Sequence, residues 1–335
     1  MEPRTQGPSV ILLGSGSWAT ALVKIMQDSL HTSRIHWYVR KPDTAEHIRQ
    51  KGRNRDYGKG FHVPLDMVDL YDVTSVLPTV DLIIHAIPSA YSSVWYREKT
   101  LHGLSAPIVI SASKGIVPEA GVTTLQWLRE KIHARHYLFL GGPCHSEEVM
   151  QESRSYLTLG STDEGVGKSC LPLFSTEYLS ATLTPYAEAL EFFGIMKNIM
   201  AIAVGMATGL GYGDNFMAIL VSAAFREIRN MAMDRGLLPE PDLSLQGGFI
   251  GDLLVTCYSP HSRNRRFGFL MARGYSADEA LTDLHMVPEG YFVLKAWKDW
   301  LHQERYPIAR TLCHICLEGY LASKAFKKLE NFLGT

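Results

Sequence analysis

A glycine-rich turn between a strand and a helix most restricts what this chain can fold into. The residues VILLGSGSWATALVKIM run from an apolar segment through Gly14 and Gly16 into an amphipathic pattern that includes Ala19. This is the G-x-G-x-x-A spacing of a dinucleotide-binding turn, in which glycine lets the backbone approach a pyrophosphate. The helix that follows offers N–H groups and a partial positive charge to the phosphates. The segment therefore predicts a Rossmann-like unit with Gly14 and Gly16 at the coenzyme.

Four further apolar runs separate helical patterns in the first half of the chain. They are IHWYV (35–39), DLIIHAIP (81–88), PIVISAS (107–113) and YLFLGG (137–142). Runs that are continuously apolar, rather than alternating, suit parallel strands that are buried on both faces. The first half therefore predicts a doubly wound α/β domain.

The second half has a different character. From Tyr186 onward long helical periodicity replaces the strand signals, beginning with YAEALEFFGIMKNIMAIAVG. Pro185, in LTPYAE, suits a helix start. A chain of 335 residues is long enough for two cores. We therefore predict a dinucleotide-binding Rossmann domain over residues 1–185 and an all-helical substrate-binding and catalytic domain over 186–335.

Charge and hydropathy exclude several classes of partner. With 33 basic and 34 acidic residues the net charge is -1, so nothing global attracts nucleic acid or an anionic membrane. The uncharged stretch from Asn198 to Gly213 is too short for a membrane span. The start, MEPRTQGPSV, lacks an apolar signal-peptide core, so a cytoplasmic protein is expected.

The 5 cysteines show no disulfide framework and fit reduced thiols. Cys313 and Cys316 stand one helical turn apart in CHIC, but no second C-x-x-C completes a set of four zinc ligands. We therefore interpret them as buried small side chains on a helix, and the sequence predicts no metal site.

The end of the second strand bears on the coenzyme. It reads WYVRKPD, without the Asp or Glu that usually binds the ribose hydroxyls of NAD. Arg40 could instead accept a 2′-phosphate, or it could be an ordinary surface residue. The expected coenzyme is NADP or NAD, with a preference for NADP.

Several segments then follow in a characteristic order. They are SASKGI (111–116), GGPCHSEEV (141–149), GIMKNIMAIAVG (194–205), GLGYGDN (209–215), GDLLVTCYSPHSRN (251–264) and VPEG (287–290). Together with the glycine-rich turn, they closely resemble the bacterial-type NAD(P)-dependent glycerol-3-phosphate dehydrogenases, from residue 9 to about residue 290.

The resemblance implies roles position by position. Lys197 matches the catalytic lysine. The matching substrate-site residues are Lys114, Gly142, Cys144, Lys197, Asp252, Ser262, Arg263 and Asn264. Besides Gly14, Gly16 and Arg40, the expected coenzyme contacts are Ser17, Trp18, Lys114, Ser146, Arg263, Val287 and Glu289. Two positions depart from the family: Cys144 stands where Ser or Thr is common, and Ser146 where Ala is common. A thiol is the weaker hydrogen-bonding group.

The residues support the chemistry that the resemblance implies. Oxidation of a secondary alcohol needs a hydride acceptor, a base and, for a phosphorylated substrate, a clamp for the anion. A lysine with the ordinary pKa of about 10.4 is a poor base near neutral pH, and burial under an apolar helix would lower that pKa. Asp252 could orient Lys197 or the substrate, or it could cap a helix.

The arginine run SRNRRFG (262–268) is interpreted as a phosphate loop. Arg263 offers a planar fork that suits a phosphate, with Ser262 and Asn264 as neutral donors. Arg265 and Arg266 are more simply solvent charges or partners of acidic residues.

The expected activity is interconversion of sn-glycerol 3-phosphate and dihydroxyacetone phosphate with NAD(P), supplying glycerophospholipid synthesis. The alternatives are a 6-phosphogluconate-like or hydroxyacid dehydrogenase, and a dinucleotide sensor without turnover. The small-molecule substrate is the expected partner, and a homodimer is possible.

Overall fold

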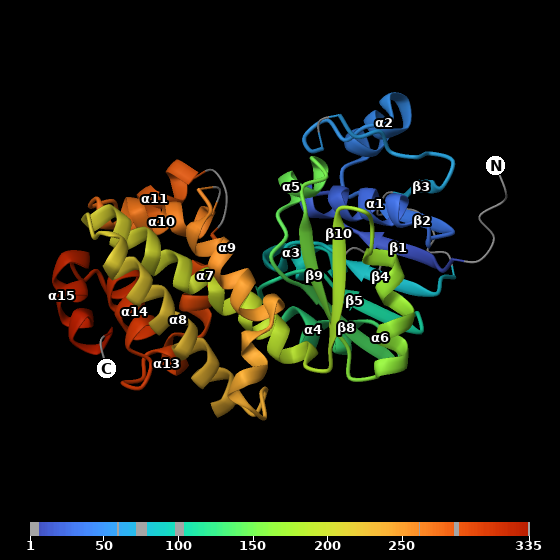
Figure 1. Ribbon diagram of the computed structural model, residues 1–335. Coiled ribbons are helices and arrows are strands. Elements are labelled where there is room, and N and C mark those ends of the chain that lie inside the picture. Colours follow the sequence, from blue (N-terminus) through green and yellow to red (C-terminus); the bar gives the residue numbers. More distant parts are fainter. Residues whose placement is uncertain are drawn as a thin grey trace. The chain divides into compact units, whose positions relative to one another are not determined.

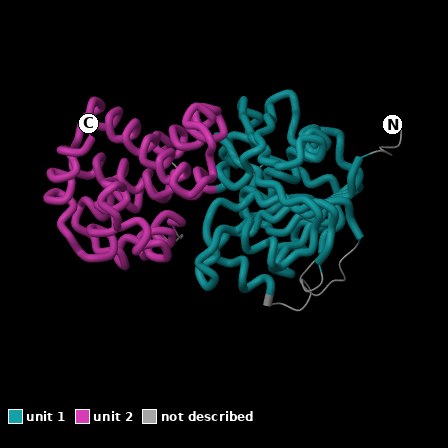
Figure 2. The backbone as a smooth tube through the Cα atoms, turned by 90° about the horizontal axis from the view of Figure 1, so that it is seen from below, with its two compact units in different colours: residues 1–191 teal, residues 192–335 magenta. Residues whose placement is uncertain are grey.

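A computed structural model describes residues 7–58, 60–71, 79–97, 104–260, 262–284 and 288–333. The chain divides into two compact units, residues 1–191 and residues 192–335 (Figure 2). The first contains a sheet and the second is helical (Figure 1), as the predicted fold class requires.

The sheet of the first unit has 8 strands in the order β10-β9-β8-β5-β4-β1-β2-β3. The strands are β1 (Ser9–Leu13), β2 (Arg34–Tyr38), β3 (Val68–Tyr71), β4 (Leu82–His85), β5 (Ile108–Ser111), β8 (His136–Gly141), β9 (Ser155–Gly160) and β10 (Leu179–Thr184). Neighbouring strands are parallel except for the antiparallel pair β8 and β9. A separate two-stranded sheet pairs β6 (Ile116–Val117) with β7 (Val122–Thr123).

Both faces of this sheet are covered. Val10 and Leu12 of β1 belong to one hydrophobic cluster, whereas Ile11 and Leu13 belong to another. The helices of the unit are α1 (Ser17–Ser29), α2 (Pro42–Lys51), α3 (Ser89–Arg97), α4 (Thr124–Lys131), α5 (Ser146–Met150) and α6 (Glu164–Cys170). The prediction of strands buried on both faces is therefore confirmed.

The second unit is built from helices. They are α7 (Ala187–Leu210), which begins in the first unit, α8 (Asp214–Asp234), α9 (Asp252–Tyr258), α10 (Arg263–Ala272), α11 (Ala277–Leu284), α12 (Glu289–Ala296), α13 (Lys298–Leu301), α14 (Pro307–Glu318) and α15 (Ala322–Leu333). Helix α7 is long and apolar enough to cross a membrane, but its most apolar window is 100% buried inside the protein. This marks it as a core helix.

Two glycines bring α7 and α10 into close contact. A Cβ at Gly205 would stand 1.8 Å from the carbonyl oxygen of Arg265, and one at Gly268 would stand 2.0 Å from that of Ile202. No larger residue fits at either position, because the opposing atoms belong to the backbone. This close packing sets the start of α10 beside α7, the helix that carries Lys197.

Candidate active site

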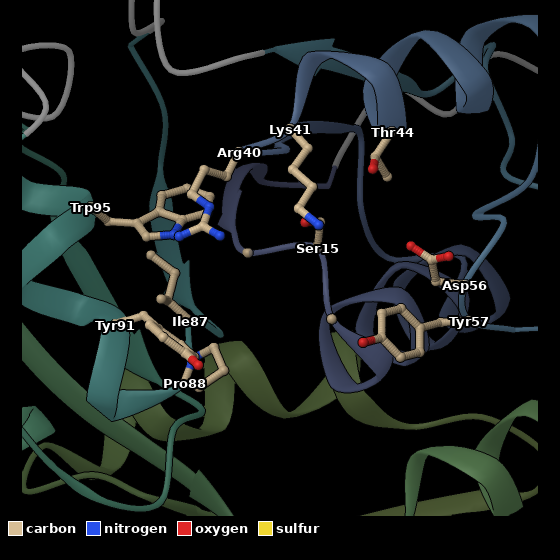
Figure 3. Close-up of a pocket in the computed structure, with 12 residues that line it drawn as sticks. Ser15, Arg40, Lys41, Thr44, Asp56, Tyr57, Ile87, Pro88, Tyr91 and Trp95 are labelled. Carbon is tan, nitrogen blue, oxygen red and sulfur yellow. The ribbon is translucent and has the colours of Figure 1, made fainter. Parts of the chain in front are cut away.

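The glycine-rich turn lies where the strand order of the sheet reverses. β1 pairs with β2 on one side and with β4 on the other, and ligands of doubly wound sheets bind outside the carboxyl ends of strands at such a point. A pocket opens there, lined by residues that follow β1, β2 and β4 (Figure 3). Gly14 and Gly16, both predicted to contact the coenzyme, are among them.

The conformation of this turn requires glycine. Gly14 has a φ of 119°, and a Cβ there would stand 2.7 Å from the carbonyl oxygen of Ala86. Near Gly16, by contrast, nothing lies within 4 Å of the place where a Cβ would stand, so a pyrophosphate has room to approach the backbone. The indole nitrogen of Trp37 donates to the carbonyl oxygen of Gly14 over 2.6 Å. The turn is therefore fixed in the form that a dinucleotide needs.

Helix α1 presents its N-terminus to the same turn. Its N-cap, Gly16, makes no side-chain capping bond, and Ser17 and Trp18 form the first turn of the helix. Trp18 also packs against the hydrophobic core. The first turn of a 13-residue helix thus offers backbone donors to an anion, so these residues fit a dinucleotide.

Two cations line the pocket beyond β2. Arg40 was predicted from the sequence, whereas Lys41, the N-cap residue of α2, was missed. Figure 3 shows Trp95, Ile87 and Tyr91 on one side of the glycine-rich turn, and Asp56 and Tyr57 on the other. The pocket therefore combines apolar walls with two positive charges.

The predicted residues after β5 and β8 lie close to one another. Lys114 Nζ donates to the carbonyl oxygen of Gly142 over 3.2 Å. Gly142 has a φ of 116°, which favours glycine. Nearby in sequence, Cys144 is half-buried against the core, and Ser146 donates to Glu147 over 3.0 Å. Of these four residues, Lys114 and Gly142 are hydrogen-bonded to each other.

In the second unit Lys197 and Asp252 form a buried ion pair. Lys197 Nζ lies 2.5 Å from Asp252 Oδ1, and the two side chains are 9% and 3% exposed. Lys197 projects from α7, and Asp252 begins α9 directly after the π-helical turn Gly247–Gly251. Of the three roles open to Asp252, helix capping does not fit, because the N-cap of α9 is Gly251 and makes no side-chain cap bond, and the short distance favours orientation of Lys197.

A second network of buried side chains includes Asn198, the residue that follows Lys197 in the sequence. Asn264 Nδ2 donates to Asn198 Oδ1 over 3.0 Å, and Asn264 Oδ1 accepts from the backbone of Gly290 over 2.9 Å. Asn198 Nδ2 in turn donates to Glu289 over 3.4 Å. The network links α7, α10 and α12, and it contains Asn264 and Glu289, which the sequence predicted. Asn198 was missed, although it directly follows Lys197.

The arginine run is a helix and not the predicted loop. Ser262 caps α10 by accepting from the backbone of Arg265 over 3.3 Å, and Arg263 is exposed in the first turn. Arg265 donates to the carbonyl oxygen of Tyr258, and Arg266 pairs with Asp283 over 3.0 Å. Of the two alternatives left open for Arg266, a solvent charge or a partner of an acidic residue, the structure shows the second. Val287, a predicted coenzyme contact, lies outside the described residues.

The thiol nearest this region is not a nucleophile. Burial raises the pKa of Cys257 to about 12, although the positive charges of Lys197 and Arg265 oppose the rise. A protonated, buried thiol is inert. Cys257 therefore takes no part in proton transfer beside the Lys197–Asp252 pair.

Sequence comparisons identify the family of the chain. Residues 9–166 match the family described as NAD-dependent glycerol-3-phosphate dehydrogenase N-terminus, and residues 187–327 match its C-terminus. The chain is 30% identical over 320 residues to glycerol-3-phosphate dehydrogenase [NAD(P)+] of Agathobacter rectalis, covering 95% of this chain and 94% of the relative. It is 32% identical over 339 residues to glycerol-3-phosphate dehydrogenase [NAD(P)+] 1 of Salinibacter ruber, covering 98% of each.

Solved structures share the fold. Glycerol-3-phosphate dehydrogenase of Coxiella burnetii superposes with a TM-score of 0.83 at 22% identity, covering 97% of this chain and 99% of the other. The Plasmodium falciparum enzyme gives a TM-score of 0.84 at 19% identity, covering 97% and 96%. With the family matches over both units, the chain belongs to the NAD-dependent glycerol-3-phosphate dehydrogenases, NAD(P)-dependent oxidoreductases that interconvert sn-glycerol 3-phosphate and dihydroxyacetone phosphate.

Proposed function

We propose that this chain works chiefly in the reductive direction, with Lys197 as the proton donor and NADPH as the preferred coenzyme. Its product, sn-glycerol 3-phosphate, would then supply glycerophospholipid synthesis. The observation that carries the proposal is the buried pair of Lys197 and Asp252.

The pair suits proton donation to a ketone. A carboxylate 2.5 Å from the amine favours the ammonium form, in which Lys197 carries the proton that the carbonyl oxygen needs. A bound nicotinamide coenzyme, held at the glycine-rich turn, would supply or accept the hydride. Lys197 gives its proton to the carbonyl oxygen during reduction and takes it back from the hydroxyl during oxidation. Asp252 holds the amine in place through both directions.

The phosphate of the substrate needs fixed cations and donors. Arg263, exposed at the start of α10, is the proposed partner of the phosphate in the second unit. Lys114, half-buried beside Gly142 in the first unit, keeps its expected role toward substrate and coenzyme. The first turn of α10 adds backbone donors for an anion. Arg266 is excluded from this role because it pairs with Asp283.

The coenzyme preference rests on the end of β2. Arg40 and Lys41 both line the pocket, and no acidic residue follows β2 directly. Two cations would stabilise the 2′-phosphate of NADPH at this position, whereas the ribose hydroxyls of NAD usually bind a carboxylate at the end of the second strand. We therefore propose that NADPH is used at least as well as NADH.

The test is the oxidation of NADPH and NADH by the purified chain over a concentration series of dihydroxyacetone phosphate. We expect substrate-dependent oxidation with both coenzymes and a kcat/KM for NADPH that equals or exceeds the value for NADH. Dihydroxyacetone without its phosphate is the control, and it should react poorly. A clear preference for NADH would overturn the coenzyme assignment, and no turnover with either would favour a dinucleotide sensor.

A further inference from the structure

Two imidazoles and one carboxylate meet in the second unit, and none of them is assigned to coenzyme or substrate. His302 follows α13, whereas His314 and Glu318 lie four residues apart on α14. One ligand atom from each residue lies within 4.8 Å of the others. Two histidines and one carboxylate form a ligand set that Zn²⁺ accepts.

The spacing of the nitrogen atoms fits a tetrahedral ion. His302 Nε2 lies 3.4 Å from His314 Nδ1. Two nitrogens bound to zinc at about 2.0–2.1 Å, with a tetrahedral angle between them, stand about 3.4 Å apart. The two carboxylate oxygens of Glu318 face the two histidines: Oε2 is hydrogen-bonded to His314 Nδ1 over 2.8 Å, and Oε1 lies 3.7 Å from His302 Nε2.

The negative charge of Glu318 is in a position where a cation would stabilise it. Glu318 is the last residue of α14, where the helix dipole disfavours an anion. The ammonium of Lys298 lies 3.0 Å from Glu318 Oε1, so a cation already occupies one side of the carboxylate.

The cluster is reachable from solvent. The side chains of His302, His314 and Glu318 are 32%, 23% and 25% exposed. His314 and Tyr320 also line an open cavity, and their rings lie 4.7 Å apart. The cavity reaches one of the three residues, His314, and the partial exposure of all three side chains gives an ion access to them.

The thiols of the CHIC segment do not belong to this cluster. Cys313 and Cys316 are buried on α14, and they are not part of the group formed by His302, His314 and Glu318.

We propose that His302, His314 and Glu318 bind one Zn²⁺ ion, with water as the fourth ligand. The ammonium of Lys298, whose side chain is 41% exposed, withdraws to solvent when the ion enters. Any proton shared between His314 and Glu318 is released. The ion then ties the end of α13 to the last turn of α14 and stabilises the second unit.

The experiment is calorimetric titration of the chelator-treated full-length chain with Zn²⁺. We expect one ion per chain, and a midpoint of thermal unfolding that rises as zinc is added. His302→Gln and His314→Gln each remove one of three protein ligands, so each should weaken binding at least about tenfold, since even loss of a supporting outer-shell contact costs about 10–100-fold. His31→Gln, an exposed histidine of the first unit, is the matched control and should bind as the wild type does.

The variants should retain wild-type turnover in the absence of metal, which shows that they fold. Absence of saturable binding, or unchanged affinity in both histidine variants, would overturn the proposal. Co²⁺ substitution in the wild-type chain gives an independent check. Nitrogen and oxygen ligands produce no thiolate-to-cobalt charge-transfer band, and the appearance of such a band would assign the ion to Cys313 or Cys316 instead.

Discussion

Lys197 on α7 and Asp252 on α9 are 55 residues apart in sequence, yet their charged atoms lie 2.5 Å apart in the core of the second unit. Burial of two charges costs several kcal/mol per ion, and this cost is offset only while the two remain paired. Stabilisation of the fold alone therefore does not explain why the pair is buried. The arrangement does hold the proton of Lys197 at a fixed position.

The first prediction concerns Asp252→Asn, which leaves the ammonium of Lys197 buried without its counter-charge. We expect the free energy of unfolding to fall by about 3–5 kcal/mol, as in other broken buried pairs. Denaturation in urea measures it. Asp28→Asn is the matched control, because Lys24 is equally buried but keeps Glu152 as a second partner at 2.8 Å. Equal losses in the two variants would contradict a special dependence of Lys197 on Asp252.

The second prediction separates two arginines on α10. Arg263→Ala should raise the KM for dihydroxyacetone phosphate by about thirtyfold, because loss of a charge-assisted contact costs on the order of 2 kcal/mol. Arg266→Ala should change the KM little, since Arg266 pairs with Asp283. Steady-state kinetics of both variants provide the comparison. Similar small effects at the two positions would remove Arg263 from the substrate site.

The third prediction concerns Arg40→Asp. A carboxylate at the end of β2 repels a 2′-phosphate but can accept from a ribose hydroxyl, so affinity for NADPH should fall more than affinity for NADH. Fluorescence titration with each coenzyme measures the two dissociation constants. Lys41→Asp should act in the same direction, because Lys41 lines the same pocket. Equal losses for both coenzymes would show that neither cation recognises the 2′ position.

The fourth prediction concerns the buried Glu191, which accepts from the backbone of Leu125 over 2.8 Å. Burial raises its pKa from 4.5 to about 8. Because the folded chain holds this proton more tightly than the unfolded chain, its contribution to stability is present below about pH 4.5 and is lost as the pH rises to about 8.

Urea denaturation of wild type and Glu191→Gln at several pH values tests this. Between pH 4.5 and 8 the wild type should lose at least about 1.4 kcal/mol relative to the variant, the free energy of one pKa unit. Glu130→Gln, an exposed position on α4, should follow the wild-type curve. A constant difference between wild type and Glu191→Gln across this range would refute the assignment.

The sequence identified the strands that are buried on both faces, because continuous apolar runs such as that of β1 have no other simple explanation. In the 8-stranded sheet it missed β3, β9 and β10. β10 alternates Thr and Ser with apolar residues, and its burial is uneven because it is an edge strand. An edge strand is not apolar throughout, so a search for apolar runs passes over it.

The site was predictable only in part. The glycine-rich turn is a local motif, and Gly14 and Gly16 lie where its spacing placed them. The orientation of Asp252 toward Lys197, and the bond of Asn264 to Asn198, depend on how α7 packs against α9 and α10. Contacts between separate helices cannot be predicted from the spacing of residues along the sequence. The start of α10 at Ser262 was not predicted, because three arginines with an asparagine suggested a loop.

The most direct test of the account is the kinetics of Lys197→Met. If Lys197 transfers the proton, kcat should fall by about two to four orders of magnitude, the usual range for general acid–base groups, while coenzyme affinity stays near the wild-type value. Lys24→Met, which removes another buried and ion-paired lysine, should cost stability but not kcat. The wild-type rate of glycerol 3-phosphate oxidation should also rise with pH through one ionisation that the Lys197 variant lacks. A variant with near-normal kcat and an unchanged pH profile would contradict the account and make Lys197 a structural residue.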